Sequence, residues 1–232
     1  MPNWCFQEFE VTGNADSLRT FVKATEMKNE EGHVRYGLNH LFPIPEELAN
    51  TVSGWSSNEE EQAEREKQYA ANTEKYGWKD WYDWAYANWS TKWGACEFDW
   101  NHFDALAPIV YDDTQTSITG YFESAWGPAT GLIEKISGDY PNLVFSIVFT
   151  EESNAFFGCT VFHQGEIVFD AGEDGDMPES VSKKWEAAHT DENLWDEAYE
   201  AQNDWMDNIR GKYELLAAEA VNRIKNSQTA AG

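Results

Sequence analysis

The stretch LVFSIVFTEESNAFFGCTVFHQGEIVFDAG, residues 143–172, decides the fold. Its opening run, residues 143–152, is rich in β-branched and aromatic side chains and is the strongest strand signal in the chain. Residues 156–164 give the next strongest signal, and Gly165 favours a tight turn into residues 166–172. We therefore expect a strand followed by a β-hairpin within one antiparallel sheet.

Two strand–helix pairs precede this stretch. Residues 4–11 alternate apolar and polar side chains apart from an out-of-phase Phe6, and Asn14 or Asp16 then caps a helix. Residues 117–126 alternate in the same way and also lead into a helix. The apolar residues at helical spacing are Leu18, Phe21 and Val22 in the first helix and Leu132, Ile133 and Ile136 in the second.

Residues 34–45, VRYGLNHLFPIP, are interpreted as a further strand that ends at its two prolines, since proline cannot donate to a strand ladder. The resulting order is strand, helix, strand, insertion, strand, helix, strand, strand. This order predicts an α+β fold, an antiparallel sheet with two helices packed on one face.

The insertion covers about residues 46–92. Residues 46–77 are polar, rich in Glu and helical in propensity, so we expect them on the surface. Residues 78–100 hold six tryptophans, and the spacing of Trp81, Trp84 and Asn88 predicts a short helix before a more strand-like end. These rings favour a place in the core, with an aromatic pocket for a small ligand such as a nucleotide signal as the alternative.

Four segments resemble a known family: MPNWC at the N-terminus, WYDWAYANWSTKW, FESAWGPATGLIEKISGDYPNL and FTEESNAFFGCTVF. Together they are similar to the Api92-like family with its YubB-type ferredoxin-like domain, found in phages, prophages and conjugative plasmids. The resemblance covers about residues 1–170 and departs at Ser90, where the family string favours glycine, so the backbone angle there is left open. It implies a ferredoxin-like fold and a mobile-element origin, and it implies no catalytic residue.

Composition restricts the function. The 232 residues include 42 Asp and Glu against 16 Lys and Arg, a net charge of −26, together with 12 Trp. Such a chain repels nucleic acid and attracts basic surfaces, while its aromatic content indicates a folded core. Three widely spaced cysteines and the lack of a long apolar run favour a cytosolic protein, with no disulfide framework and no membrane partner.

No motif for catalysis or cofactor binding emerges. Cys159 and His163 are four residues apart on one strand, too far to act as a nucleophile–base pair. Residues 170–181 approach a calcium loop but place Gly172 and Val181 at two ligand positions. No phosphate-binding glycine motif occurs. We expect no catalytic residue, no metal and no cofactor.

The C-terminal third differs in kind. From Glu173 to Glu219 there are 14 acidic and 4 basic residues, with apolar residues at helical spacing, which predicts one or two amphipathic acidic helices. We divide the chain into residues 1–172, a ferredoxin-like domain with its insertion, and residues 173–232, an acidic helical extension. Acidic helix faces often do no more than keep a protein soluble.

A sharper hypothesis treats the extension as a binding surface. Helices with carboxylates every few residues can place charge at a spacing comparable with DNA, and so occupy the basic channel of a nucleic-acid-handling protein. We expect a non-enzymatic phage or plasmid protein that binds a basic surface of a host protein or nucleoprotein complex and inhibits a defence nuclease, of CRISPR or restriction type. The candidate binding residues are Glu186, Asp191, Glu192, Asp196, Glu197, Glu200, Asp204 and Asp207, with Trp195 and Trp205 as possible anchors.

Overall fold

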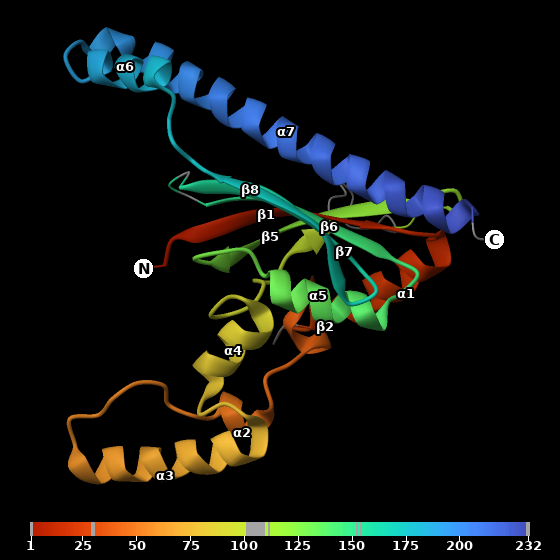
Figure 1. Ribbon diagram of the computed structural model, residues 1–232, viewed down its shortest axis with the longest axis vertical. Coiled ribbons are helices and arrows are strands. Elements are labelled where there is room, and N and C mark those ends of the chain that lie inside the picture. The colour runs from red at the N-terminus through yellow and green to blue at the C-terminus, as the bar shows by residue number, and fades with distance from the viewer. Residues whose placement is uncertain are drawn as a thin grey trace.

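A computed structural model describes residues 2–28, 31–100, 110, 112–151, 153 and 155–230. Within these residues, six strands form one antiparallel sheet in the order β4-β5-β1-β6-β7-β8 (Figure 1). The strands are β1 (Trp4–Thr12), β4 (Asp99–Trp100), β5 (Ser117–Ala125), β6 (Val144–Glu151), β7 (Phe156–His163) and β8 (Glu166–Asp174).

Four of these strands and two helices make a ferredoxin-like unit. In chain order it is β1, α1 (Ala15–Thr25), β4, β5, α5 (Thr130–Asp139) and β6. The spatial order β4-β5-β1-β6 places β1 between β5 and β6, which are joined by a helix, as in a split βαβ arrangement. β7 and β8 extend this sheet beyond β6. The predicted ferredoxin-like α+β fold is confirmed.

α1 and α5 cover one face of the sheet, as predicted. Asn14 caps α1 by accepting a hydrogen bond at Oδ1 from the Ser17 amide at 2.9 Å. Below the helices, Phe9 of β1 lies at the centre of an aromatic core, with no solvent exposure and ring contacts to neighbouring strands and to α1. The rings around it are those of Phe21, Phe98, Trp100, Phe122 and Phe145.

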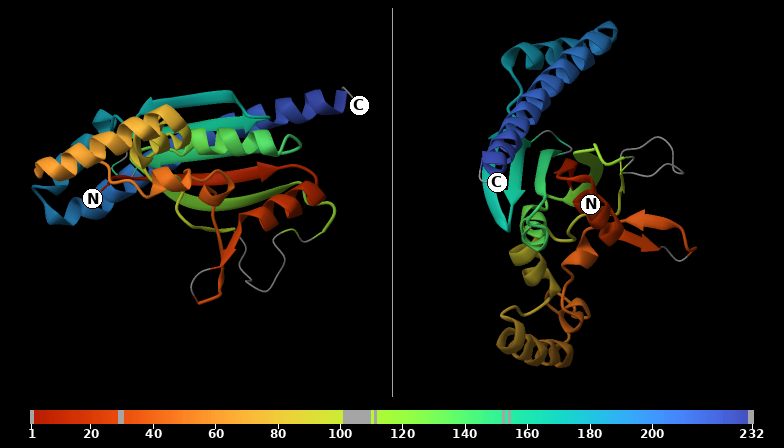
Figure 2. Two further views of the ribbon diagram at one scale, coloured as in Figure 1. Left: turned by 90° about the horizontal axis from the view of Figure 1, so that it is seen from below. Right: turned by 90° about the vertical axis from the view of Figure 1, so that its right-hand side faces the viewer.

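The opposite face is covered by α7 (Trp195–Ala230), which lies across β6, β7 and β8 (Figures 1 and 2). A second hydrophobic core forms between them. Its buried members are Val144, Phe157, Cys159 and Val161 of the sheet and Tyr213, Ala217, Ala220 and Val221 of the helix. The C-terminal half of α7 is therefore part of the sheet's packing.

No helix of the described ranges has the length and apolar character that crossing a bilayer demands.

The β-hairpin around Gly165 is confirmed. β7 and β8 pair antiparallel, with His163 opposite Glu166. Gln164 and Gly165 between them have φ values of 55° and 82°. Two successive residues with positive φ are the signature of the turn that matches the twist of paired strands.

The segment between α1 and β4, which includes the insertion predicted at about residues 46–92, differs in part from the prediction. It contains β2 (Glu26–Lys28), β3 (Val34–Tyr36), the short 3-10 helix η1 (Asn39–Leu41), α2 (Glu46–Ala49), α3 (Glu59–Tyr76) and α4 (Trp81–Trp89). Only Val34–Tyr36 of the predicted strand 34–45 is a strand. The chain turns after Tyr36, where the Gly37 amide donates to the Thr25 carbonyl, and η1 follows. α2, α3 and α4 extend away from the sheet on the side opposite α7 (Figure 1).

Candidate protein-binding surface

The acidic residues singled out from the sequence meet on one projecting element. α6 (Glu179–Ala188), the short helix η2 (Glu192–Leu194) and the beginning of α7 form a helical hairpin that extends past one end of the sheet (Figure 1). We call residues 185–209 the acidic tip, because they contain eight carboxylates and neither Lys nor Arg. All eight carboxylate residues are exposed, and they are the eight named above.

A cluster of rings holds the two helices of the hairpin together. Trp185 of α6 lies 5.4 Å from Trp195 and 5.0 Å from Tyr199 of α7, between ring centroids. His189 lies 5.0 Å from Trp195. Lys184 adds an ion pair to Glu197, with 3.1 Å between nitrogen and oxygen. The tip is consequently a defined surface rather than two independent helices.

The two predicted anchor tryptophans have different positions. Trp195 is half-buried within the cluster of rings at the tip, so part of its surface remains open to solvent. Trp205 packs its ring 5.7 Å from that of Phe157 and belongs to the core between α7 and the sheet. Of the two, Trp195 is the one placed at the tip surface. The ring cluster adds Trp185 and Tyr199, the second of which is 53% exposed and was not among the predicted residues.

The central tryptophans lie mostly in the main core. Trp84, Trp89 and Trp100 are at most 5% exposed, so they fill the space between the insertion and the sheet. Trp93 and Trp126 are near 40% exposed, with ring centroids 5.8 Å apart, and form a surface patch.

Lys92 lies beside this patch. Its Nζ atom is 4.5 Å from the centroid of Trp93 and 5.4 Å from that of Trp126, a cation–π arrangement. The rings of Trp81 and Tyr82 are each 5.9 Å from the same nitrogen. Four rings therefore surround one ammonium group, three of them from the segment before β4 and one, Trp126, from just after the end of β5.

Ser90 has a left-handed backbone, with φ of 63°, at the C-terminal end of α4. This is the position at which the family resemblance leads us to expect glycine, the residue that adopts such angles without steric cost. The Ser90 Oγ atom accepts a hydrogen bond from the Gly131 amide at 3.1 Å, which ties the end of α4 to α5. The departure from the family pattern is therefore compatible with the same backbone conformation.

Cys159 and His163 do not form a catalytic pair. Cys159 is fully buried in the second core, and burial, together with the Asp170 carboxylate, raises the pKa of its thiol to about 11. A thiol with such a pKa is protonated near neutral pH, the reverse of an activated nucleophile. His163 instead places Nδ1 3.1 Å from the Leu143 carbonyl oxygen.

A cavity lies beside α7, on the part of its sheet face that the helix does not cover. Its volume is about 230 Å³. The lining residues are Phe6, Glu8, Tyr121, Val148, Phe149, Thr150, Phe157, Met206, Asp207, Arg210 and Tyr213. None of these except Asp207 was singled out as a site residue, since the residues are far apart in the sequence.

The fold and the tip define a ferredoxin-like α+β protein that carries an acidic helical hairpin. Residues 95–205 match the family model described as the ferredoxin-like domain in Api92-like protein. Over these residues the chain is similar to the Api92-like family, and the match supports the resemblance seen in the sequence for this part of the chain. The matched residues extend beyond residue 173 into the first part of α7.

The chain is also similar to a solved structure, the crystal structure of a protein api92 from Yersinia pseudotuberculosis. The two share 12% sequence identity, with 77% of this chain and 100% of that chain covered, at a TM-score of 0.41. No curated protein matches the chain.

Proposed function

We propose that this protein is a non-enzymatic phage or plasmid protein that binds a basic surface of a host protein or nucleoprotein complex through its acidic tip. The target class that best fits is a nucleic-acid-handling defence complex, a CRISPR or restriction nuclease, whose channel the tip occupies in place of DNA. The observation that carries this proposal is the run of eight exposed carboxylates without a Lys or Arg between residues 185 and 209.

The geometry of α7 supports mimicry of a phosphate backbone. Asp196, Glu200, Asp204 and Asp207 follow one another at intervals of four, four and three residues, so they lie along one face of the helix. With about 1.5 Å of rise per residue and Glu197 beside them, one carboxylate occurs per about 4 Å of axis, against about 3.4 Å per phosphate along a DNA strand. The buried residues of α7 follow the opposite face, so the acidic stripe faces solvent.

Charge complementarity also predicts the physical behaviour of the complex. Exposed carboxylates that meet Lys and Arg steer the encounter and raise the association rate, and this contribution decreases as salt is added. A partner held by the tip should therefore elute with salt and compete with duplex DNA.

The test uses the full chain as bait in affinity capture from host cells at low and high salt, with duplex DNA as competitor. The tip variant neutralises four exposed carboxylates that have no described ion pair: Glu192→Gln, Asp196→Asn, Glu200→Gln and Asp204→Asn. A matched control variant neutralises four exposed carboxylates of α3 that likewise have no described ion pair: Glu59→Gln, Glu60→Gln, Glu66→Gln and Glu74→Gln. Both variants change the net charge by the same amount.

We expect a DNA-binding partner that elutes with salt, is displaced by duplex DNA, and is lost with the tip variant while the α3 variant retains it. Loss of at least tenfold in affinity is the expected scale, because several charge contacts are removed together. Equal binding of the two variants to that partner would show that only net charge matters, and the proposal would be wrong.

A further inference from the structure

The cavity beside α7 combines flat aromatic walls with carboxylates. Phe6 of β1 and Tyr121 of β5 point away from the main core toward α7, with ring centroids 6.4 Å apart and planes inclined by 22°. In the strand register, Phe6 is opposite Glu123 and Tyr121 is opposite Glu8, so each ring has a carboxylate as its cross-strand neighbour. On this face of β1 and β5, aromatic rings and carboxylates therefore alternate both along each strand and across the pair.

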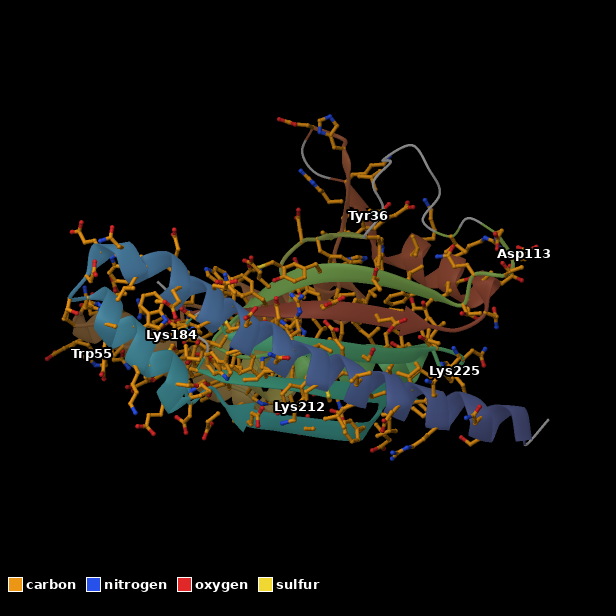
Figure 3. All side chains as sticks on the ribbon, turned by 90° about the horizontal axis from the view of Figure 1, so that it is seen from above. Tyr36, Trp55, Asp113, Lys184, Lys212 and Lys225 are labelled. Atoms are coloured by element: carbon orange, nitrogen blue, oxygen red, sulfur yellow. The ribbon has the colours of Figure 1, made fainter. Side chains whose placement is uncertain are left out.

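α7 forms one side of the cavity. Its side chains of Met206, Asp207, Arg210 and Tyr213 line one wall. Arg210 is the cavity's own cation, and its guanidinium group lies 3.6 Å from Asp207 and 3.3 Å from Glu214, so two carboxylates balance it. Figure 3 shows α7 passing over the β7–β8 side of the sheet, with β5 to one side of the helix and not beneath it.

The cavity carries more negative than positive charge, and one of its aromatic rings is exposed to solvent. Tyr121 is 47% exposed, whereas the other aromatic side chains in the strands of this sheet are buried or partly buried. Burial, and then the carboxylate of Glu123, raise the pKa of Tyr121, so its phenol remains neutral and able to donate a hydrogen bond at neutral pH. Glu8 and Asp207 line the space itself, and among the described residues that line it Arg210 is the only cation.

We propose that this cavity is a guanidinium pocket, filled by one arginine side chain of the basic protein that the acidic tip binds. The assignment of the arginine to that basic protein rests on the proposed function, whereas the preference of the pocket for a guanidinium group does not. A volume of about 230 Å³ is below the roughly 300–1,000 Å³ of pockets that hold drug-sized ligands, which suits a single side chain.

Arginine fits this pocket better than lysine does. A planar guanidinium stacks on aromatic faces and directs several N–H donors outward in its plane, where Glu8 and Asp207 can accept them. A lysine ammonium is a compact, strongly hydrated charge without a flat face. Arginine also dominates the energetic centres of protein interfaces, and this pocket lies beside the acidic stripe of α7, which shares Asp207 with it.

The first experiment tests the pocket alone. Methylguanidinium is titrated into the full chain labelled with ¹³C at the methionine methyl groups, and NMR follows Met206, which lines the cavity. The signals of Met27 and Met177, outside the lining, serve as internal controls. We expect a saturable shift of Met206 alone, and binding of methylammonium that is at least tenfold weaker.

Variants assign the site. Tyr121→Leu removes one ring, Glu8→Gln removes one carboxylate, and Tyr86→Leu removes an exposed ring of α4 as the control. The first two should weaken methylguanidinium binding at least fivefold, and the control should leave it unchanged. Equal shifts with methylammonium, or a Tyr121→Leu variant that titrates like the parent, would overturn the inference.

The second experiment tests the source of the guanidinium. Three nonapeptides are compared by calorimetry: nine lysines, four lysines on each side of an arginine, and the same peptide with neutral citrulline in the centre. The arginine peptide should bind at least fivefold more tightly than the citrulline peptide, and Tyr121→Leu should remove that difference. The tip variant should weaken all three in parallel, since it leaves Glu8 and Asp207 in place.

The two failures are distinguishable. Equal binding of the three peptides, with all of them weakened by the tip variant, would overturn the pocket and leave the proposed function standing. Binding of methylguanidinium without measurable binding of any of these peptides would overturn the arginine source, and would count against the proposed function as well.

Discussion

The packing of α7 on the sheet leads to a sharp prediction about two neighbouring alanines. Ala217 is 4% exposed and belongs to the second core, whereas Ala218 is exposed on the same turn of the helix. Ala217→Asp and Ala218→Asp share the loss of helix propensity, at most about 0.7 kcal/mol. Only the first places a carboxylate among apolar side chains of β6 and β7.

The magnitude follows from the environment of each residue. An unpaired carboxylate moved into an apolar site costs several kcal/mol, so Ala217→Asp should lower the free energy of unfolding by at least about 3 kcal/mol. Ala218→Asp should lower it by less than about 1 kcal/mol. In a domain of this size, a loss of 3 kcal/mol corresponds to a decrease in Tm of about 6–12 °C.

Urea unfolding, followed by tryptophan fluorescence and far-ultraviolet circular dichroism, measures both variants. If α7 detaches before the sheet unfolds, the measured cost is limited to the free energy of docking α7, and an early transition with loss of helix signal should appear for Ala217→Asp only. Equal midpoints for the two variants, without an early transition in either, would refute the packing of α7 on the sheet.

Three further results are expected. Burial raises the pKa of Cys5 to about 12 and that of Cys159 to about 11. A thiol reagent at pH 8 should therefore label the less buried Cys96 first, and should label Cys5 and Cys159 only when the protein unfolds. Early labelling of Cys5 or Cys159 would contradict their burial. Burial alone would raise the pKa of Glu151, but hydrogen bonds, chiefly from Ser153, outweigh it and lower the pKa, so this residue adds stability that is lost as pH falls below about 4.5. Urea midpoints of Glu151→Gln should accordingly depend less on pH in that range, and an unchanged profile would refute this. Lys92→Gln should lower the free energy of unfolding, measured with urea, by about 1 kcal/mol, because its cation–π contacts are lost. An unchanged free energy would show that the four rings around Lys92 do not stabilise the fold through this contact.

The strands of the sheet could be predicted because their local signals agree with their environment. Val144–Glu151 of β6 combine β propensity with buried or partly buried side chains, and Gln164-Gly165 adopts the positive φ values that their turn requires. The strand predicted for residues 34–45 is wrong beyond Tyr36, because the two prolines set only the latest residue at which a strand can end and not the residue at which it does end. After Tyr36 the chain turns at Gly37 and continues into η1, so no further strand hydrogen bonds form in this segment.

For the candidate surface, the sequence predicts where the carboxylates lie but not how the helices pack or where the cavity forms. A count of carboxylates locates residues 185–209, but helical periodicity says which face is buried and not what it packs against. The pairing of Trp185 with Trp195 depends on the chain reversal at η2, and the cavity depends on the adjacency of β1 and β5. The out-of-phase Phe6 was a local sign of a second apolar face on β1.

Helix α7 packs on the sheet with one face and presents carboxylates on another, and this separation makes the binding tests interpretable. Apolar residues from Trp205 onward, with Tyr213 to Val221 most buried, hold the helix on the sheet, whereas the carboxylates of the acidic tip contact solvent. Because the helix is continuous from Trp195 onward, the sheet fixes the direction in which the tip projects. Neutral substitutions at the tip should thus change binding without changing stability, and disruption at Ala217 should impair both. Binding that survived detachment of α7 would mean that the tip alone, and not its placement beside the cavity, recognises the partner.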